Sequence, residues 1–290
     1  MRIAVHGKPY DNSLSDAVEI FFDLLGKHDF EVIVSQDFHP FLHNFAFAKN
    51  LDTYSKASGL DDISFLFTLG GDGTLLEAVT HIGDKEIPII GVNMGRLGFL
   101  ATIGMEQIDY AINQIVENKF TIDKRVLLRL EDGNNLFDGS PFALNDFTII
   151  KKDTSSMIVV HTYVDGEFLN SFWADGLIIS TPTGSTGYSL SCGGPLVLPQ
   201  SGNFIINPVS PHNLNVRPMV LADNCILSFK IDARVDNVLI SLDSRSVTVP
   251  VNTELTIKKE NFYACLVKFD GYHPFDTLRH KLYWGQDARN

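Results

Sequence analysis

The feature that most constrains the fold is a change in the spacing of apolar residues near residue 121. Before that point, runs typical of buried strands alternate with apolar side chains at helical spacing, as at Val18, Phe22 and Leu25. After it the helical spacing disappears, and short β-rich runs are separated by turn-forming pairs such as Asp165-Gly166. The pattern predicts an N-terminal α/β domain over 1–121 with a mostly parallel sheet. It also predicts a C-terminal antiparallel, β-sandwich-like domain over 122–270.

The same patterns predict the individual elements. In the first domain we expect helices around 14–25 and 106–118, and strands at 3–6, 31–35, 63–69 and 87–92. The aromatic stretch 39–60 carries no assignment. In the second domain the β-rich runs occupy 126–130, 147–151, 158–164, 177–180, 226–231, 238–242, 255–258 and 264–269. Residues 274–284 return to helical spacing.

The composition is that of a folded protein whose surface does not attract polyanions. Of the 290 residues, 44% are hydrophobic and 20% are charged, which is ordinary for a soluble domain. The formal net charge of −12 provides no field that would draw DNA, RNA or an anionic membrane. Phosphate-bearing small molecules remain compatible, because backbone amides can bind them. We therefore expect no nucleic-acid partner and no membrane partner.

Cysteine usage and the N-terminus indicate the compartment. Cys192, Cys225 and Cys265 are far apart in the sequence and form no metal-binding cluster, which favours reduced thiols over a zinc site. The N-terminal sequence MRIAVHGKPY reads as a strand and lacks the basic and apolar regions of a signal peptide. No run of about 18 uncharged apolar residues is present to span a bilayer. We expect a cytoplasmic protein.

The first candidate site is the segment Gly70-Gly71-Asp72-Gly73-Thr74, between a strand pattern and a helical one. Such a turn presents backbone N–H groups at the start of a helix, and glycine lets the backbone approach a bulky anion. It predicts a phosphate-binding turn, although neither a P-loop nor a G-x-G-x-x-G pattern is present. Asp72 is equally compatible with a helix N-cap and with a carboxylate that ligates a cation or faces a reacting hydroxyl.

The second candidate site is the segment 175–195, DGLIISTPTGSTGYSLSCGGP, rich in threonine, serine and glycine. Its hydroxyls and glycine turns suit a ligand with many oxygens, such as a ribose or a pyrophosphate. The alternative is a flexible surface loop. Tyr188, Leu190 and Pro195 disfavour that alternative, because such residues anchor a loop.

Together these residues resemble the NAD kinase family. The GGDGT turn alone is shared with diacylglycerol kinases, sphingoid-base kinases and 6-phosphofructokinases. The resemblance becomes specific through the pair Asn145-Asp146 and the segment 175–195. Gly91-Val92-Asn93 and Gly98-Phe99-Leu100 add to it. It covers essentially the whole chain and is weakest over residues 36–60.

The resemblance implies an enzyme that phosphorylates the 2′-hydroxyl of the adenosine ribose of NAD with ATP, giving NADP and ADP. It implies Asp72 as the general base. Because a carboxylate is a weak base and phosphoryl transfer has a loose transition state, we infer that Asp72 mainly orients the hydroxyl and accepts its proton late.

The resemblance also implies the binding residues. Asn145 is expected at the adenine edge, Asp146 at the ribose diol and Asp175 near the nicotinamide half. Most relatives carry Glu at position 146, and Asn-Asp or Asp-Gly pairs are also typical of plain turns. A solvated surface position is equally plausible for Arg245. The further residues implied are Gly71, Gly73, Thr74, Thr183, Thr186, Gly187, Tyr188, Ser189, Leu190, Ser191 and Arg245.

The implied cofactor and assembly follow from the same resemblance. No lysine lies in the GGDGT turn or its immediate flanks, so we expect amides, distant basic residues and a divalent metal to offset the triphosphate charge. The metal is expected to be Mg²⁺, with no protein ligand assigned. Relatives are homo-oligomers, so a dimer or tetramer is expected, and the segment 271–290 is expected to pack back on the N-terminal domain.

Two other functions compete with this one. A kinase of the same loop group that acts on a lipid or a sugar phosphate is disfavoured by the segment 175–195. A non-catalytic NAD(P)-binding sensor is disfavoured by the intact GGDGT turn with Asp72.

Overall fold

The computed structural model describes residues 1–10, 14–95, 98–131, 135–152, 156–271 and 274–283. Its contacts divide the chain into two compact units. Unit 1 consists of residues 1–123 and 265–290, and unit 2 of residues 124–264. The boundaries expected from the sequence were 121/122 and 270/271. Among the described residues, no helix is long and apolar enough to cross a bilayer.

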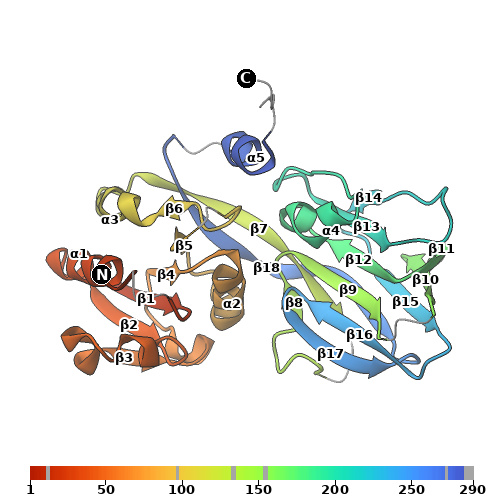
Figure 1. Cartoon of the computed structure of the whole chain (residues 1–290), viewed down its shortest axis with the longest axis horizontal. Coiled ribbons are helices and arrows are strands. Elements are labelled where there is room, and N and C mark those ends of the chain that lie inside the picture. The colour runs from red at the N-terminus through yellow and green to blue at the C-terminus, as the bar shows by residue number, and fades with distance from the viewer. Residues whose placement is uncertain (11–13, 96–97, 132–134, 153–155, 272–273, 284–290) are drawn as a thin grey trace. The chain divides into compact units, whose positions relative to one another are not determined.

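Unit 1 is built on a parallel sheet (Figure 1). Its strand order is β18-β5-β4-β1-β2-β3, with β6 paired to β5. Central strands β1, β4 and β5 are almost wholly buried, as parallel strands covered on both faces must be. The bounds are β1 Arg2–Gly7, β2 Glu31–Ser35, β3 Asp52–Tyr54, β4 Phe65–Leu69, β5 Ile89–Asn93, β6 Ile103–Gly104 and β18 Leu255–Phe269.

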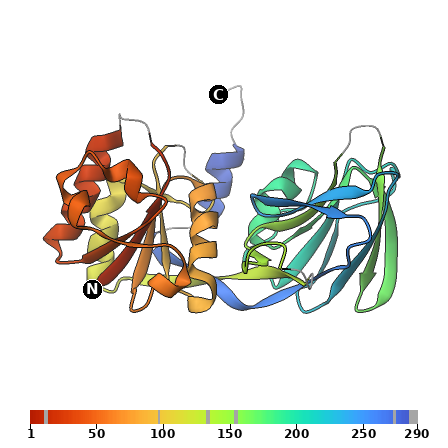
Figure 2. The same ribbon diagram turned by 90° about the horizontal axis from the view of Figure 1, so that it is seen from below.

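Helices cover the two faces of this sheet (Figure 2). Helices α1 (Ser15–Lys27) and α3 (Ile108–Val116) bury their apolar stripes in one core together with alternate residues of β1, β4 and β5. Helix α2 (Asp72–Ile82) contacts β1, β4 and β5 and directly follows β4. The unassigned stretch 39–60 forms the short helices η2 His39–Leu42, η3 Ala46–Asn50 and η4 Ala57–Gly59, together with edge strand β3. The helical spacing at the C-terminus corresponds to α5 (Pro274–Leu282), in unit 1.

Unit 2 is a sandwich of antiparallel strands, as predicted. One sheet has the order β14-β13-β12-β9-β16-β17, and the opposing layer contains β11-β10-β15-β18 together with β7 and β8. Their inner faces share one core, to which Phe147, Leu177, Val160 and Phe229 contribute. The bounds are β7 Phe120–Glu131, β8 Phe142–Ala143, β9 Asp146–Lys151, β10 Ile158–Val164, β11 Glu167–Ala174, β12 Gly176–Ser180, β13 Asn203–Val209, β14 Met219–Ala222, β15 Leu227–Asp232, β16 Asn237–Leu242 and β17 Arg245–Pro250.

One strand differs from expectation. The runs 255–258 and 264–269 were predicted as separate strands, but they belong to the single strand β18, which passes from unit 2 into unit 1. The charged residues between them are tolerated because they are paired. Lys259 lies 2.7 Å from Asp223, and the buried Glu260 lies 2.9 Å from Arg129. Charge paired in this way does not end a strand.

Candidate active site

A cavity of about 410 Å³ lies at the carboxyl ends of three neighbouring strands in unit 1. Lys8 follows β1, Gly70 and Gly71 follow β4, and Asn93 ends β5, and all four line the cavity. Ligands of open parallel sheets bind outside the carboxyl ends of the strands. The GGDGT turn thus opens into the part of this unit where a ligand is expected.

The glycines of the turn have different roles. Gly70 has a φ of 156°, and a Cβ there would lie 2.2 Å from Oγ1 of the buried Thr74. It is therefore needed for the backbone to turn into α2. Gly71 and Gly73 are exposed, with open space where a side chain would be. The N–H groups of Asp72 and Gly73, the first two residues of α2, have no acceptor within the helix and can bind a phosphate here. The N–H of Thr74 instead donates to the Gly71 carbonyl (3.0 Å).

Asp72 is not the helix cap. The N-cap of α2 is Gly71, and Asp72 is the first residue of the helix. Its carboxylate instead accepts three backbone N–H groups from the loop after β5: Oδ2 from Phe99 (2.8 Å), and Oδ1 from Leu100 (3.0 Å) and Ala101 (2.9 Å). The cap alternative is thereby removed, and a half-buried, rigidly oriented carboxylate stands at the mouth of the glycine turn.

Lys8 is a cation that the sequence did not reveal. Its Nζ lies 3.0 Å from Oε2 of Glu77, one turn into α2. His6 Nε2 lies 3.4 Å from the same oxygen. The neighbouring His6, and also Lys8, lower the pKa of Glu77 to about 2, although burial opposes this. The strand β1 thus brings a positive charge to the glycine turn from 62 to 66 positions earlier in the chain, a distance that motif spacing cannot show.

In unit 2, the Asn145-Asp146 turn is shaped by Asp243, which sequence reasoning also missed. The Asp243 carboxylate accepts N–H groups from Leu144 (2.9 Å), Asn145 (2.8 Å) and Asp146 (3.2 Å). Asp243 has a left-handed φ of 52° in the turn between β16 and β17. The backbone of the predicted adenine- and ribose-binding pair is therefore fixed by a distant carboxylate.

Asp146 is buried beside that carboxylate. Burial, and then the charge of Asp243, raise the pKa of Asp146 to about 7. Asp146 and Asp175 also contribute to the raised pKa of Tyr188, after burial and Cys192. A Cβ at Gly187 would lie 3.8 Å from Asp146 Oδ2. These predicted residues therefore lie close together within unit 2.

The hydroxyl-rich segment forms two short helices, η7 (Thr183–Thr186) and α4 (Tyr188–Ser191), after β12. Some of its hydroxyls bind the protein itself. Thr183 Oγ1 accepts from Arg125 Nη1 (3.2 Å), and Thr186 Oγ1 donates to the Thr183 carbonyl (3.2 Å). Ser189 is fully buried against Asn207. Tyr188 and Ser191 are exposed, and Leu190 is half-buried. The segment is an anchored turn rather than a loose loop.

Asp175 and Arg245, both predicted to bind a ligand, make polar contacts with other residues of the chain. Asp175 Oδ1 lies 2.6 Å from Lys151 Nζ, at the start of β12. Arg245 donates to the carbonyls of Ser140 (2.6 Å) and Phe142, and its guanidinium lies 5.7 Å from the centre of the Phe137 ring. Arg245 is thus not a solvated surface residue. Its contacts brace the backbone before Asn145.

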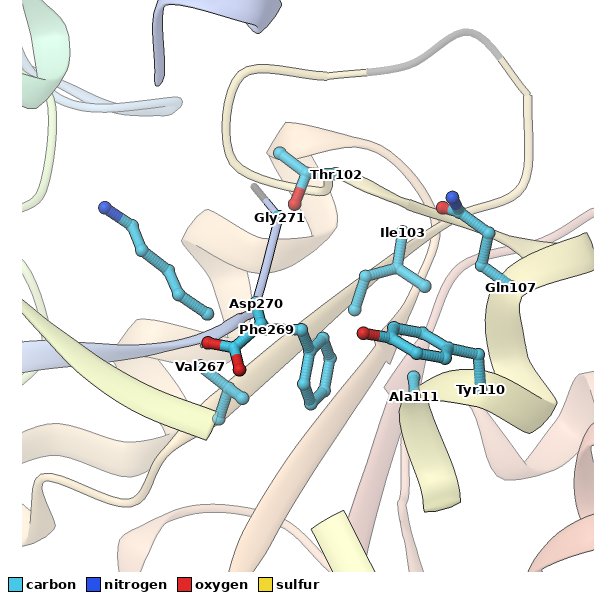
Figure 3. Close-up of a pocket in the computed structure, with 10 residues that line it drawn as sticks. Thr102, Ile103, Gln107, Tyr110, Ala111, Val267, Phe269, Asp270 and Gly271 are labelled. Atoms are coloured by element: carbon cyan, nitrogen blue, oxygen red, sulfur yellow. The ribbon is translucent and has the colours of Figure 1, made fainter. Parts of the chain in front are cut away.

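A second cavity in unit 1, of about 300 Å³, lies apart from the glycine turn (Figure 3). The rings of Tyr110 and Phe269 flank it, with centres 6.3 Å apart. Thr102, Gln107 and Asp270 add polar groups. None of the residues that line it was predicted to bind a ligand.

Comparison with known proteins accounts for nearly the whole chain. Residues 3–120 match the model of the ATP-NAD kinase N-terminal domain, and residues 144–269 match the model of the ATP-NAD kinase C-terminal domain. The NAD kinase of Cytophaga hutchinsonii is 47% identical over 292 residues, and that of Flavobacterium psychrophilum is 44% identical over 294, each covering 100% of both chains.

Solved structures agree with these matches. The yeast NADH kinase complexed with NADH superposes with a TM-score of 0.86 at 25% identity, covering 100% of this chain and 89% of its own. The NAD kinase from Archaeoglobus fulgidus in complex with ATP gives a TM-score of 0.75 at 26% identity, covering 98% and 99%. The predicted combination of a parallel α/β unit and an antiparallel β unit is therefore confirmed, and the chain belongs to the NAD kinase family.

Proposed function

We propose that the chain transfers the γ-phosphoryl group of ATP to the 2′-hydroxyl of the adenosine ribose of NAD, giving NADP and ADP. The observation that carries the proposal is the placement of Asp72. A carboxylate fixed by three amides stands at the first residue of α2, beside a cavity formed by the glycine turn and Lys8. Full-length identity of up to 47% to proteins named NAD kinase supports the choice of acceptor.

The roles of the unit 1 residues follow from their chemistry. The amides at Gly71 and Gly73 bind the donor phosphates, with Lys8 supplying a positive charge, while Thr74, whose N–H donates to the Gly71 carbonyl (3.0 Å), holds the turn and lines the cavity. Asp72 orients the attacking hydroxyl and accepts its proton late, since a loose transition state requires little proton removal at the start.

The unit 2 residues bind the acceptor in this proposal. Asn145 offers a donor and an acceptor to the adenine edge, and Asp146 accepts from the ribose diol. Asp175 faces the nicotinamide half, and exposed Tyr188 and Ser191 provide polar groups at the turn. Thr183 and Ser189, whose hydroxyls bind protein groups, contribute mainly by holding the turn. The remaining turn residues, Thr186, Gly187 and Leu190, and the bracing Arg245 complete the set.

The proposed Mg²⁺ fits this chain as a metal carried by the nucleotide. Within the described residues, no group of three or more His, Cys, Asp or Glu side chains is arranged to hold a metal ion. The Asp72 carboxylate is already engaged by three amides. A Mg²⁺ ion that binds triphosphate oxygens and water needs no such group, and it would neutralise charge on the donor.

We also propose that the protein is a cytoplasmic homo-oligomer, a dimer or a tetramer. Unit 2 exposes large apolar side chains that a second copy could bury, among them Phe168, Trp173 and Leu214. The exposed fraction of Leu214 is 84%.

The direct test is formation of NADP from ATP, Mg²⁺ and NAD, detected with an NADP-specific dehydrogenase. Asp72→Asn should reduce turnover by roughly 10²–10⁴-fold, while NAD binding measured by calorimetry changes little. Near-normal turnover of this variant would remove Asp72 from its role. Phosphorylation of a lipid or sugar phosphate without NADP formation would refute the proposed acceptor.

A further inference from the structure

The loop that follows β5 holds the Asp72 carboxylate with three consecutive backbone amides. An ionised carboxylate has about four lone-pair positions. The amides of Leu100 and Ala101 occupy Oδ1, and the amide of Phe99 occupies one position of Oδ2. With respect to the described residues, one acceptor position remains, on Oδ2. The loop therefore determines which oxygen of Asp72 is left to meet a substrate hydroxyl.

The carboxylate can occupy this position only if residue 98 has no side chain. A Cβ on Gly98 would lie 1.9 Å from Asp72 Oδ1, 2.7 Å from Cγ and 3.0 Å from Oδ2. All three nearest atoms belong to the same carboxylate. Any side chain at position 98 must push the carboxylate away from the amides.

The loop itself is firmly placed. The Gly98 amide donates to the Ala101 carbonyl (3.1 Å), which closes a tight turn, and Ala101 is fully buried. A Cβ on Gly91 of β5 would lie 2.8 Å from Ala101 Cα, so the loop rests directly on the strand backbone. The Lys281 ammonium of α5 lies 5.6 Å from the centre of the Phe99 ring. A loop held in this way can position a carboxylate, whereas a mobile loop could not.

We propose that Gly98–Ala101 is a positioning clamp for Asp72, and that Gly98 is a positioning residue for phosphoryl transfer. The clamp as a structural device stands on the geometry alone, and its effect on the reaction rests on the proposed function. Three acceptor positions of Asp72 are taken by the clamp, which leaves Oδ2 to orient one hydroxyl as far as the described residues are concerned.

The first experiment separates turnover from binding. Gly98→Ala should lower kcat by roughly 10–100-fold, as expected for a displaced catalytic group, while KM for NAD changes less than about threefold. The matched control is Gly26→Ala near the end of α1, where a Cβ meets nothing within 4 Å. Equal kcat in both variants would overturn the catalytic part of the proposal.

The second experiment needs no activity. Gly98→Ala should lower the Tm by roughly 3–10 °C in the native background through overpacking. In an Asp72→Ala background it should lower the Tm by less than about 2 °C, because the three atoms nearest to the added Cβ are then absent. An equal loss in both backgrounds would refute the clamp, even if NADP is formed. If the native protein forms no NADP and the Tm loss is equal in both backgrounds, both proposals are refuted. If it forms no NADP but the Tm loss is smaller in the Asp72→Ala background, only the proposed function is refuted.

Discussion

At the scale of single residues, the ribose-binding role proposed for Asp146 implies that NAD binding is coupled to protonation. Burial and the adjacent Asp243 raise its pKa to about 7, so the carboxyl is mostly neutral at pH 6 and mostly ionised at pH 8. The ionised form accepts both hydrogen bonds of a ribose diol, whereas the neutral form offers a poorer acceptor. Binding of NAD should therefore favour the ionised form and release a proton near neutral pH.

The pH dependence of NAD affinity tests this coupling. Between pH 8 and pH 6 we expect the Kd for NAD to rise by about tenfold, because the ionised fraction falls by about that factor around a pKa of about 7. Asp146→Asn should bind more weakly at pH 8 and lose most of the pH dependence. Titration calorimetry in buffers of different ionisation enthalpy measures both the affinity and the proton release. A pH-independent Kd for the native protein would contradict the role of Asp146.

In the proposed function, Lys8 supplies positive charge to the donor phosphates. It lines the glycine-turn cavity, and its Nζ lies 3.0 Å from Oε2 of Glu77. A charged hydrogen bond contributes about 1.5–3 kcal/mol, so Lys8→Ala should raise KM for ATP by roughly 10–100-fold. Lys8→Arg should retain much of the affinity, and the exposed Lys27 of α1, changed to Ala, is the control. A KM for ATP unchanged in Lys8→Ala would remove this lysine from the donor site.

At the scale of elements, the turn between β16 and β17 organises the start of β9. The Asp243 carboxylate satisfies the amides of three consecutive residues, Leu144 to Asp146. Asp243→Ala leaves those amides unpaired and should cost about 3 kcal/mol of unfolding free energy, or more. We expect a lower denaturant midpoint and a weaker NAD affinity together. Asp52→Ala, at an exposed position of β3, should change neither. Normal NAD affinity in Asp243→Ala would show that the turn is held by other contacts.

The spacing of apolar residues was sufficient to predict the first helix and the central strands of unit 1. The stripe through Val18 and Phe22 predicted α1, and the buried runs predicted β1, β2, β4 and β5 within two residues of their observed ends. Edge strands such as β3 and β14 were missed, because short, half-exposed segments carry little apolar periodicity. The buried strand β13, between β14 and β12, was missed as well. Strand β18 was divided in two because its ion-paired residues resembled a turn.

The sequence motifs identified the candidate site residues, but not the residues that hold them in place. Asp72 and Asp146 stand in short, recognisable segments. The Asp72 carboxylate is held by residues 27 to 29 positions away, and the backbone of Asp146 by a residue 97 positions away. Such pairs depend on which strands become neighbours, and nothing local in the sequence encodes that. The resemblance to the family could have singled out Gly98. The need for glycine at this position becomes clear only from its contact with Asp72.

At the scale of the whole molecule, the chain begins in unit 1, forms unit 2 and returns. Every buried residue of the unit 2 core lies between Leu128 and Ile257, inside the continuous segment 124–264. Unit 1 is discontinuous. The second part of β18 pairs with β5 at Leu266 and Ile89, and Val267 and Phe269 pack on the unit 1 core.

This connectivity predicts unequal behaviour of fragments. The segment 124–264 should fold alone into a β unit with a cooperative thermal transition, because its core is complete. The segment 1–123 should not, because it leaves β5 without its β18 neighbour and the core without its covering residues. Joining 1–123 to 265–283 through a short Gly/Ser linker should restore cooperative unfolding. The two parts are in contact near the join, since Asp123 Oδ2 lies 2.6 Å from Nζ of Lys268, three residues beyond the second end.

Circular dichroism melts and the dispersion of amide proton resonances measure the outcome for all three proteins. Fragment 124–264 contains Asn145, Asp146 and Tyr188 but lacks Asp72, so it should fold without producing NADP, alone or at any ATP concentration. If 1–123 alone unfolds as cooperatively as the linked protein, the returning strand is not part of the unit 1 core. The GGDGT turn would then owe its shape to the first 123 residues only, and β18 would serve merely as a connection between the units.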